Sequence, residues 1–262
     1  MKKPKVSILM TAYNHQMYIK SSIDSILSQT FKKFEFIIID NGSKDNSRKI
    51  IKSYKDKRIK FYSFKKNIGR TKCLNFGLKK CVGKYIAIQD SDDLSKRKRI
   101  QTQLDFMEKN LDFGLIGSNY NIIDSNKKII EKKIVNSDFE ENPNKILFKN
   151  TIAHSTTMYR NEILRKIGGY PKQYLYAQDY AFYLKVVKKY KIKLLSKILV
   201  DIRVNHINSE THRLKKSTSI QLEEIKLIFW IIKNIKLNLK EKFQILFKLF
   251  IVIIKIFRSL IN

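Results

Sequence analysis

The stretch that decides the fold of this 262-residue chain is Lys84-Tyr85-Ile86-Ala87-Ile88-Gln89-Asp90-Ser91-Asp92-Asp93. Its apolar run is rich in β-branched and aromatic residues, which is typical of a strand buried on both faces in a parallel sheet. Three carboxylates follow within four residues, at the position where open α/β sheets bind ligands. Clustered acids repel one another, so a hard divalent cation is their natural partner. A solvated acidic turn or a helix N-cap is the alternative.

The residues before this stretch alternate between strand and helix patterns. Strands are expected at residues 6–10, 34–39 and 59–63, with a helix after each. The order β-α-β-α-β-α-β predicts an α/β fold with a mostly parallel central sheet. Three strands then end in polar residues at one edge, namely Tyr13/Asn14, Asp40 and Asp90. We therefore expect a ligand site there. A dinucleotide-binding turn is not indicated, because residues 11–14 contain no glycine.

The second half of the chain mixes strands and helices less regularly. A basic helix follows Asp93, and Ser125-Asn126-Lys127 predicts a hairpin turn between two strands. Gln178-Asp179 opens a helix with one apolar face. The strands expected in this half are Phe113 to Tyr120, Ile129 to Val135, Thr156 to Arg160 and Ile198 to Val204. Everything after Gln221 is amphipathic and rich in Lys.

The composition of the chain indicates what kind of partner it binds and in which cellular compartment it is found. The chain has 54 Lys and Arg against 23 Asp and Glu, a formal net charge of +31, which favours an anionic partner. Cys73 and Cys81 indicate reduced thiols and hence a cytoplasmic location. No leader sequence is expected before the first strand, and no stretch of 18 uncharged apolar residues predicts a spanning helix.

These motifs, taken in order, resemble the family 2 glycosyltransferases of the GT-A fold over about residues 5–210. The matching stretches are Val6–Asn14, Phe36–Ser47, Asn67–Leu78, Tyr85–Asp93, Met158–Tyr170, Gln178–Leu184 and Arg203–Ser209. The resemblance implies a GT-A Rossmann-like catalytic domain at residues 1–212, with a nucleotide-binding half (1–110) and an acceptor-binding half (111–212). A C-terminal amphipathic helical tail would occupy residues 213–262.

The resemblance also implies roles for residues that hold the nucleotide-sugar. Tyr13 would stack on the base, unless it is a core tyrosine, and Asp40 would accept a hydrogen bond from the imide of uracil. Asp90 would contact the ribose. Arg70 and Lys72 would face the diphosphate, or else be solvated charges on a helix. The full implied donor set is Thr11, Ala12, Tyr13, Asn14, Asp40, Arg70, Lys72, Asp90 and Ser91.

The D-x-D element Asp90-Ser91-Asp92 implies a divalent metal cofactor, Mn²⁺ or Mg²⁺. Asp92 would bind the metal, with Asp93 as support. His206 matches a histidine that completes the metal shell or touches the diphosphate in some members of the family. A surface histidine is the alternative reading of His206.

Asp179 matches the family's catalytic base, which takes the proton from the acceptor hydroxyl; the alternative is a helix cap. His154, Gly169 and Tyr170 match the acceptor side. The chain departs from the usual pattern at three positions, which are Thr11 for a proline, Asn41 for a second acid and Gln178 for an acid. The last departure makes the assignment of the base rest on Asp179 alone.

The expected function is therefore an inverting, metal-dependent transfer of a sugar from a nucleoside diphosphate donor, with UDP expected, to a hydroxyl of a glycan or lipid-linked glycan. Two alternatives come from other classes: a basic nucleic-acid-binding protein, and an inactive relative that only binds a nucleotide-sugar. The basic residues are dispersed and the predicted site is acidic, so no nucleic acid partner is expected. The Lys-rich tail predicts attachment to an anionic membrane, on its cytoplasmic face. Packing against the catalytic domain, or against a second subunit in a homodimer, is the alternative for the tail.

Overall fold

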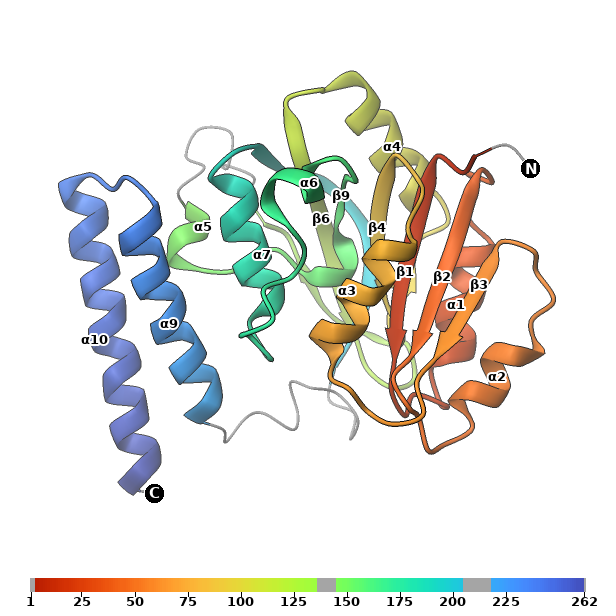
Figure 1. Cartoon of the computed structure of the whole chain (residues 1–262), viewed down its shortest axis with the longest axis horizontal. Helices are drawn as coiled ribbons and strands as arrows, with labels where there is room; N and C mark the ends of the chain where they lie inside the picture. Colours follow the sequence, from red (N-terminus) through yellow and green to blue (C-terminus); the bar gives the residue numbers. More distant parts are fainter. Residues whose placement is uncertain (1–2, 136–144, 205–217, 262) are drawn as a thin grey trace.

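The computed structural model describes residues 3–135, 145–204 and 218–261, with side chains up to Ile256 in the last segment. It has a central sheet with helices on both faces and a pair of long helices at one end (Figure 1). The strands are β1 (Val6–Ala12), β2 (Phe34–Asp40), β3 (Ile59–Ser63), β4 (Tyr85–Asp90), β5 (Leu94–Ser95), β6 (Phe113–Ile123), β7 (Ile129–Lys133), β8 (Met158–Arg160) and β9 (Lys191–Arg203). The helices are α1 (Ile19–Leu27), α2 (Ser47–Ser53), α3 (Arg70–Lys80), α4 (Arg99–Lys109), α5 (Lys145–Phe148), the 3₁₀ turn η1 (His154–Thr156), α6 (Ile163–Ile167), α7 (Gln178–Val187), α9 (Thr218–Asn234) and α10 (Leu239–Ile261).

The first half of the sheet is parallel, in the order β3-β2-β1-β4. Alternate residues of these buried strands point to opposite faces. Leu9 and Ile37 pack toward α3, whereas Ile8, Met10 and Phe36 pack with α1 and α4. This two-sided burial explains why β1, β2 and β4 are rich in apolar residues, whereas β3 at the edge of the sheet is only half-buried or exposed. The predicted alternation of strands and helices in this half, and the α/β fold class, are confirmed.

The second half of the sheet is mixed. β8 pairs antiparallel with both β4 and β6, and β9 runs parallel to β6. The predicted hairpin is present, because β6 and β7 are antiparallel and Lys127 in the turn has φ 68°. The last strand was expected from Ile198, but β9 begins at Lys191. It starts earlier because Ile192 and Leu194 alternate with Lys and are buried beside β6.

The two C-terminal helices lie side by side at one end of the molecule (Figure 1). Leu227, Ile228 and Ile231 of α9 are buried in the same core cluster as α3 and α7. Ile245 and Val252 of α10 are buried as well. The tail therefore packs in part against the α/β domain, and packing of this kind is the alternative that the sequence left open. Among the described residues, none of the helices combines the length and apolarity that crossing a membrane requires.

Candidate active site

The carboxyl ends of β1, β2 and β4 meet at one edge of the sheet. Ala12 pairs with Asp40, and Thr11 pairs with Asp90, so the three strand ends lie side by side. The loop after β1 is fastened to the loop after β2. Asn14, at φ 56°, donates its backbone N–H to Ser43 Oγ at 3.0 Å. Tyr13, between these strand ends, is half-buried.

Asp40 is fully buried and already has a counter-charge. Its Oδ2 accepts from Nε of Arg48 at 2.9 Å, and its Oδ1 accepts from the backbone N–H of Ser43 at 3.1 Å. Arg48 also donates to the carbonyl of Phe64 at 2.9 Å. A buried carboxylate is tolerated only when paired and hydrogen-bonded in this way. Arg48 thus holds the Asp40 carboxyl in place at the site edge.

Asp90 is the centre of a cluster of charged and polar groups. Its Oδ1 lies 2.6 Å from Nη2 of Arg70 and 3.3 Å from Nδ1 of His154. Arg70 and His154 are themselves 2.9 Å apart. Burial alone would raise the pKa of Asp90, but Arg70 and His154 outweigh burial and hold that pKa well below its usual range. Asp90 is therefore a carboxylate at any physiological pH.

Asp93 is held differently, in the interior. Its carboxyl accepts from the hydroxyl of Ser155 and, at 2.9 Å, from the backbone N–H of Arg203. Burial raises its pKa well above the usual range, and the charges of Asp92 and Asp90 add to this. Arg203 also donates to the backbone carbonyl of Asp92 at 3.0 Å. Asp93 and Arg203 thus fix the backbone of the acidic turn.

Ser91 is contacted from the loop after β1. Its Oγ lies 2.7 Å from Nδ1 of His15, whose backbone N–H donates to Ser47 Oγ at 2.9 Å. His15 therefore joins the β1 loop, the α2 N-terminus and the acidic turn. Nothing in the sequence spacing had singled it out.

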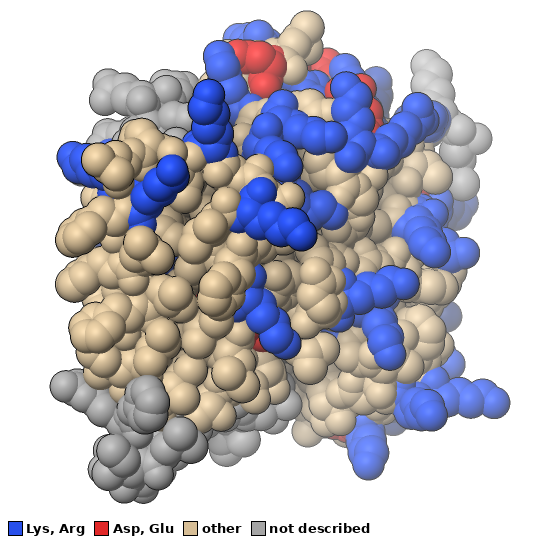
Figure 2. Space-filling view, turned by 60° about the vertical axis from the view of Figure 1, so that its left-hand side comes forward, with Lys and Arg blue, Asp and Glu red and all other residues tan. Residues whose placement is uncertain are grey.

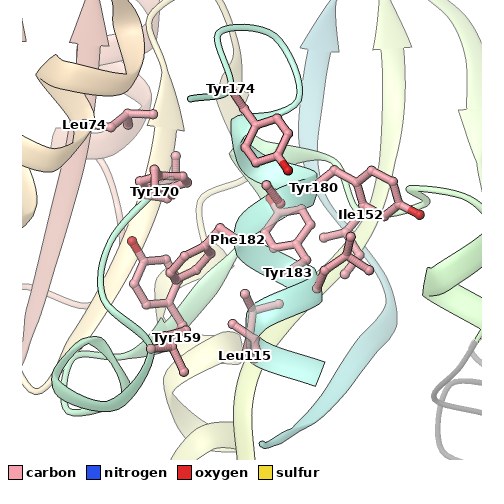
Figure 3. Packing of buried hydrophobic residues seen from close by; sticks show 14 of the residues in the cluster. Leu74, Leu115, Ile152, Tyr159, Tyr170, Tyr174, Tyr180, Phe182 and Tyr183 are labelled. Atoms are coloured by element: carbon pink, nitrogen blue, oxygen red, sulfur yellow. The ribbon is translucent and has the colours of Figure 1, made fainter. Parts of the chain in front are cut away.

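Tyr170 forms one wall of the site. Its hydroxyl is 3.0 Å from Nε2 of His154, and its ring packs on Phe182 with the centroids 4.8 Å apart (Figure 3). Asn75 fixes its backbone, donating to the Tyr170 carbonyl and accepting from the Tyr170 N–H. Gly169 is required beside this clamp, because a Cβ there would lie 2.2 Å from Asn75 Oδ1. Tyr170 is thus a rigid part of an aromatic core.

Asp179 lies in the first turn of α7, beside the same cluster. Its Oδ1 accepts from the backbone N–H of Tyr180 at 2.7 Å, and the N-cap of the helix is Ala177. Burial raises the pKa of Asp179; the charges of His154 and Arg70 offset this in part, and that of Asp90 adds to it. A carboxylate with a raised pKa, near the charges that hold Asp90, has the properties of a general base.

Two expected residues are not brought to this cluster. Lys72 is exposed and lines a groove along α3, because two residues along a helix separate it from Arg70 by about 200°. His206 lies outside the described residues. Gln178 is buried next to Asp179, and its Oε1 has no hydrogen-bond partner among the described residues.

The comparisons with known proteins agree with this geometry. The family model "Glycosyl transferase family 2" matches residues 7–168. The O-antigen biosynthesis glycosyltransferase WbnJ of Escherichia coli is 33% identical over 214 residues, which are 78% of this chain and 82% of WbnJ.

Two solved structures share the fold. The structure of S. aureus TarS 1-349 in complex with UDP-GlcNAc has a TM-score of 0.75 at 21% identity and covers 94% of this chain and 71% of that one. The mannosyltransferase PcManGT from Pyrobaculum calidifontis, in complex with GDP-Man and Mn²⁺, has a TM-score of 0.67 at 15% identity and covers 91% of this chain and 67% of that one.

The fold and site define a GT-A glycosyltransferase. The chain belongs to glycosyltransferase family 2.

Proposed function

We propose that this chain is an inverting glycosyltransferase of polysaccharide synthesis. It moves a sugar from a nucleoside diphosphate donor, UDP-linked, to a hydroxyl of a glycan or lipid-linked glycan. The observation that carries the proposal is Asp179, a half-buried carboxylate of raised pKa beside the Asp90–Arg70–His154 cluster. The O-antigen role of WbnJ and the UDP-GlcNAc complex of TarS support the substrate classes.

The donor would occupy the edge formed by β1, β2 and β4. Tyr13 offers a half-buried aromatic face for the base, and Asp40, paired with Arg48, accepts from the imide N–H of uracil. Asp90 accepts from the ribose hydroxyls. Arg70, which bonds Asp90 at 2.6 Å, is the nearest cation for the diphosphate. Thr11, Ala12, Asn14 and Ser91 complete the backbone cradle.

The acidic turn, residues 90–93, could hold a divalent cation that takes few of its ligands from the protein. Among the described residues no group of three His, Cys, Asp or Glu side chains is arranged to hold a metal, because Asp90 turns to Arg70 and Asp93 to Ser155. Mg²⁺ and Mn²⁺ are commonly held by one or two carboxylates plus substrate phosphates, and the Asp92 carboxylate meets that pattern. Asp92, with His206, would hold Mn²⁺ or Mg²⁺, which offsets charge on the departing diphosphate.

The transfer itself needs no protein nucleophile. Asp179 accepts the proton of the acceptor hydroxyl as that oxygen attacks the anomeric carbon. The bond from the anomeric carbon to the diphosphate oxygen breaks, and the electron pair leaves with the diphosphate. The sugar passes through an oxocarbenium-like state and its configuration inverts. Tyr170, His154 and Gly169 border the side from which the acceptor approaches.

The test is a donor screen followed by one substitution. Release of UDP from UDP-sugars is measured with Mn²⁺ for the wild type and for Asp179→Asn. We expect kcat to fall at least 10²-fold, the typical scale for losing a general base, with donor affinity within about twofold. If the variant loses donor affinity as well as kcat, Asp179 binds the donor. The catalytic base would then be another residue.

We further propose that the enzyme attaches peripherally to the anionic cytoplasmic face of a membrane through α10. Phe243, Leu246, Phe247, Phe250 and Ile253 recur at helical spacing and are exposed, Phe243 by 73%. Figure 2 shows a broad uncharged area on the side where α10 lies, with Lys and Arg side chains around it. So wide an apolar surface is unusual for a protein surrounded by water.

Three of the four lysines named here are exposed beside this surface, and one is not. Lys248 does not face outward, because it pairs with Glu224 at 3.0 Å and lies over the ring of Tyr180. Lys255 is exposed, as are Lys240 and Lys242 at the start of α10. Each basic residue near an anionic bilayer contributes about 1 kcal/mol.

Flotation with phosphatidylglycerol liposomes tests this attachment. Because α9 carries core residues, the informative variant is Phe247→Glu/Phe250→Glu rather than a truncation. Its matched control is Met17→Glu/Leu111→Glu, at equally exposed apolar positions far from α10 in sequence. We expect the first variant to lose flotation and the control to retain it. A wild type that does not float but forms a dimer, dissolved by the α10 variant, would make this face a subunit interface.

A further inference from the structure

A long groove runs along α3, from the active site to the opposite edge of the sheet. Ile68, Lys72 and Tyr170 line it near the site, and Lys84 and Arg165 line it at the far end. Its volume is about 1210 Å³. The helix α3 that it follows has 11 residues and is therefore about 16 Å long, a length that suits a chain rather than one small molecule.

The lining of the groove is strongly basic. It includes eight Lys and Arg residues and one acid, Glu162, whereas the whole chain has 54 against 23. Not all eight are available, since Lys5 and Lys84 pair with Glu108 and Arg160 is buried. The exposed cations include Lys79, Arg165 and Lys172, which no salt bridge joins to a carboxylate within the parts of the chain that the structure describes.

The rest of the lining suits a sugar chain. Phe64 and Phe76, whose rings pack 5.2 Å apart, contribute apolar surface between the cations. Figure 2 shows several Lys and Arg side chains over the centre and right of this face, separated by uncharged surface.

The groove approaches the site at the N-terminus of α3. Ile68, which lines it, is two residues before Arg70, and Arg70 pairs with Asp90 at 2.6 Å. A chain whose reactive end lies at Asp179 would leave the site along α3. The proposed transfer therefore has an exit path of positive charge.

We propose that this groove binds an anionic acceptor glycan, a sugar chain that carries carboxylate or phosphate groups along its length. The inference rests on the proposed function, because the groove extends the acceptor side of that site. The positive lining attracts the chain and positions its terminal hydroxyl near the base, and salt weakens this attraction.

The test compares two variants with equal change of charge. Lys79→Glu/Arg165→Glu/Lys172→Glu reverses the groove, and Lys52→Glu/Lys55→Glu/Lys57→Glu reverses exposed positions on and after α2. Binding of fluorescent oligogalacturonate, fluorescent poly(glycerol phosphate), neutral dextran oligomers and single-stranded DNA is measured by anisotropy. The two anionic glycans distinguish carboxylate from phosphate as the recognised group. Lys79→Gln/Arg165→Gln/Lys172→Gln replaces the first variant if that one melts below the wild type.

We expect at least one anionic glycan to bind the wild type, at least 10-fold weaker binding to the groove variant, and less than a twofold change in the control. Equal loss in both variants, no binding of either anionic glycan, or equal binding of dextran overturns the proposal. Tighter binding of DNA than of both glycans, lost in the groove variant, would assign the groove to nucleic acid instead. Release of UDP from UDP-sugars by the wild type is read separately, so failure of the transferase assignment is distinguished from failure of the groove.

Discussion

Glu223 in α9 accepts a 2.9 Å hydrogen bond from the backbone N–H of Ala177, two residues before Asp179. The same carboxylate accepts from the N–H groups of Leu175 and Tyr176, at 2.7 and 3.0 Å. Glu223 is buried, so these are charge-assisted bonds in a low-dielectric setting. A residue of the C-terminal tail therefore fixes the segment that leads into the proposed base.

Glu223→Gln should lower kcat by about 10-fold and the free energy of unfolding by about 2 kcal/mol, because one charge-assisted acceptor is lost. Donor affinity should stay within about twofold, since the Asp40 and Asp90 contacts are untouched. Steady-state kinetics, UDP titration and denaturant unfolding measure these effects. The neighbouring, half-buried Glu224, which pairs with Lys248, gives the matched control Glu224→Gln. If both variants lose kcat equally, the effect comes from general loosening of α9.

Asp92→Ala should abolish turnover while the fold persists, because the acidic turn lies at the rim of the sheet. The melting temperature should stay within about 2 °C of the wild type. Binding of Mn²⁺ in the presence of UDP should weaken at least 10-fold. Activity that survives the substitution, with or without a chelator, would rule out the metal role of Asp92.

Asp179→Asn should stabilise the protein at pH 7 while it lowers the rate. Burial raises the pKa of Asp179 above the ordinary 3.8, so the folded state holds its proton more tightly than the unfolded state. Ionising Asp179 therefore costs stability as the pH rises through the raised pKa, and Asn removes that cost. We expect a gain of about 0.5–2 kcal/mol, the usual range for relieving a strained functional site. The gain should vanish as the pH falls to 3.8 and below. A variant less stable than the wild type at pH 7 would contradict this account.

Gly169→Ala should lower activity and destabilise the protein by about 1–3 kcal/mol, the cost of overpacking. The added Cβ would push against Asn75 Oδ1, 2.2 Å away, and so disturb the clamp on Tyr170. The double variant Gly169→Ala/Asn75→Ala removes the clash as well as the clamp, so a double-mutant cycle measures their coupling. Additive effects of the two substitutions would contradict the proposed contact.

The strands β1, β2 and β4 could be predicted because they are buried on both faces and are rich in apolar residues. The convergence of Asp40 and Asp90 at one edge followed from the parallel order. The partners of these acids did not follow, because they come from other elements: Arg48 lies on α2, and His15 is 76 residues from Ser91. The sequence offered one hint of these contacts, which is that a basic or imidazole side chain follows the end of β1 (His15) and of β2 (Arg48) within eight residues.

The acceptor side and the tail were harder to predict. From the sequence, both Arg70 and Lys72 were expected to face the diphosphate. Because both lie in the first turn of α3, their side chains point in different directions from the helix. Glu223 had no signal in the sequence, since one acid on an amphipathic helix ordinarily faces solvent. Its partners are backbone N–H groups, which every residue except proline carries.

The three-residue strand β8 imposes a mechanical constraint on the enzyme. It is hydrogen-bonded to β4 on one side and β6 on the other, so one continuous ladder crosses the molecule. A hinge motion between the two halves of the sheet would break the hydrogen bonds of β8 to β4 or to β6. Substrate-driven rearrangement must therefore come from loops at the rim. Chimaeras that exchange donor and acceptor specificity should keep β4, β8 and β6 from a single parent.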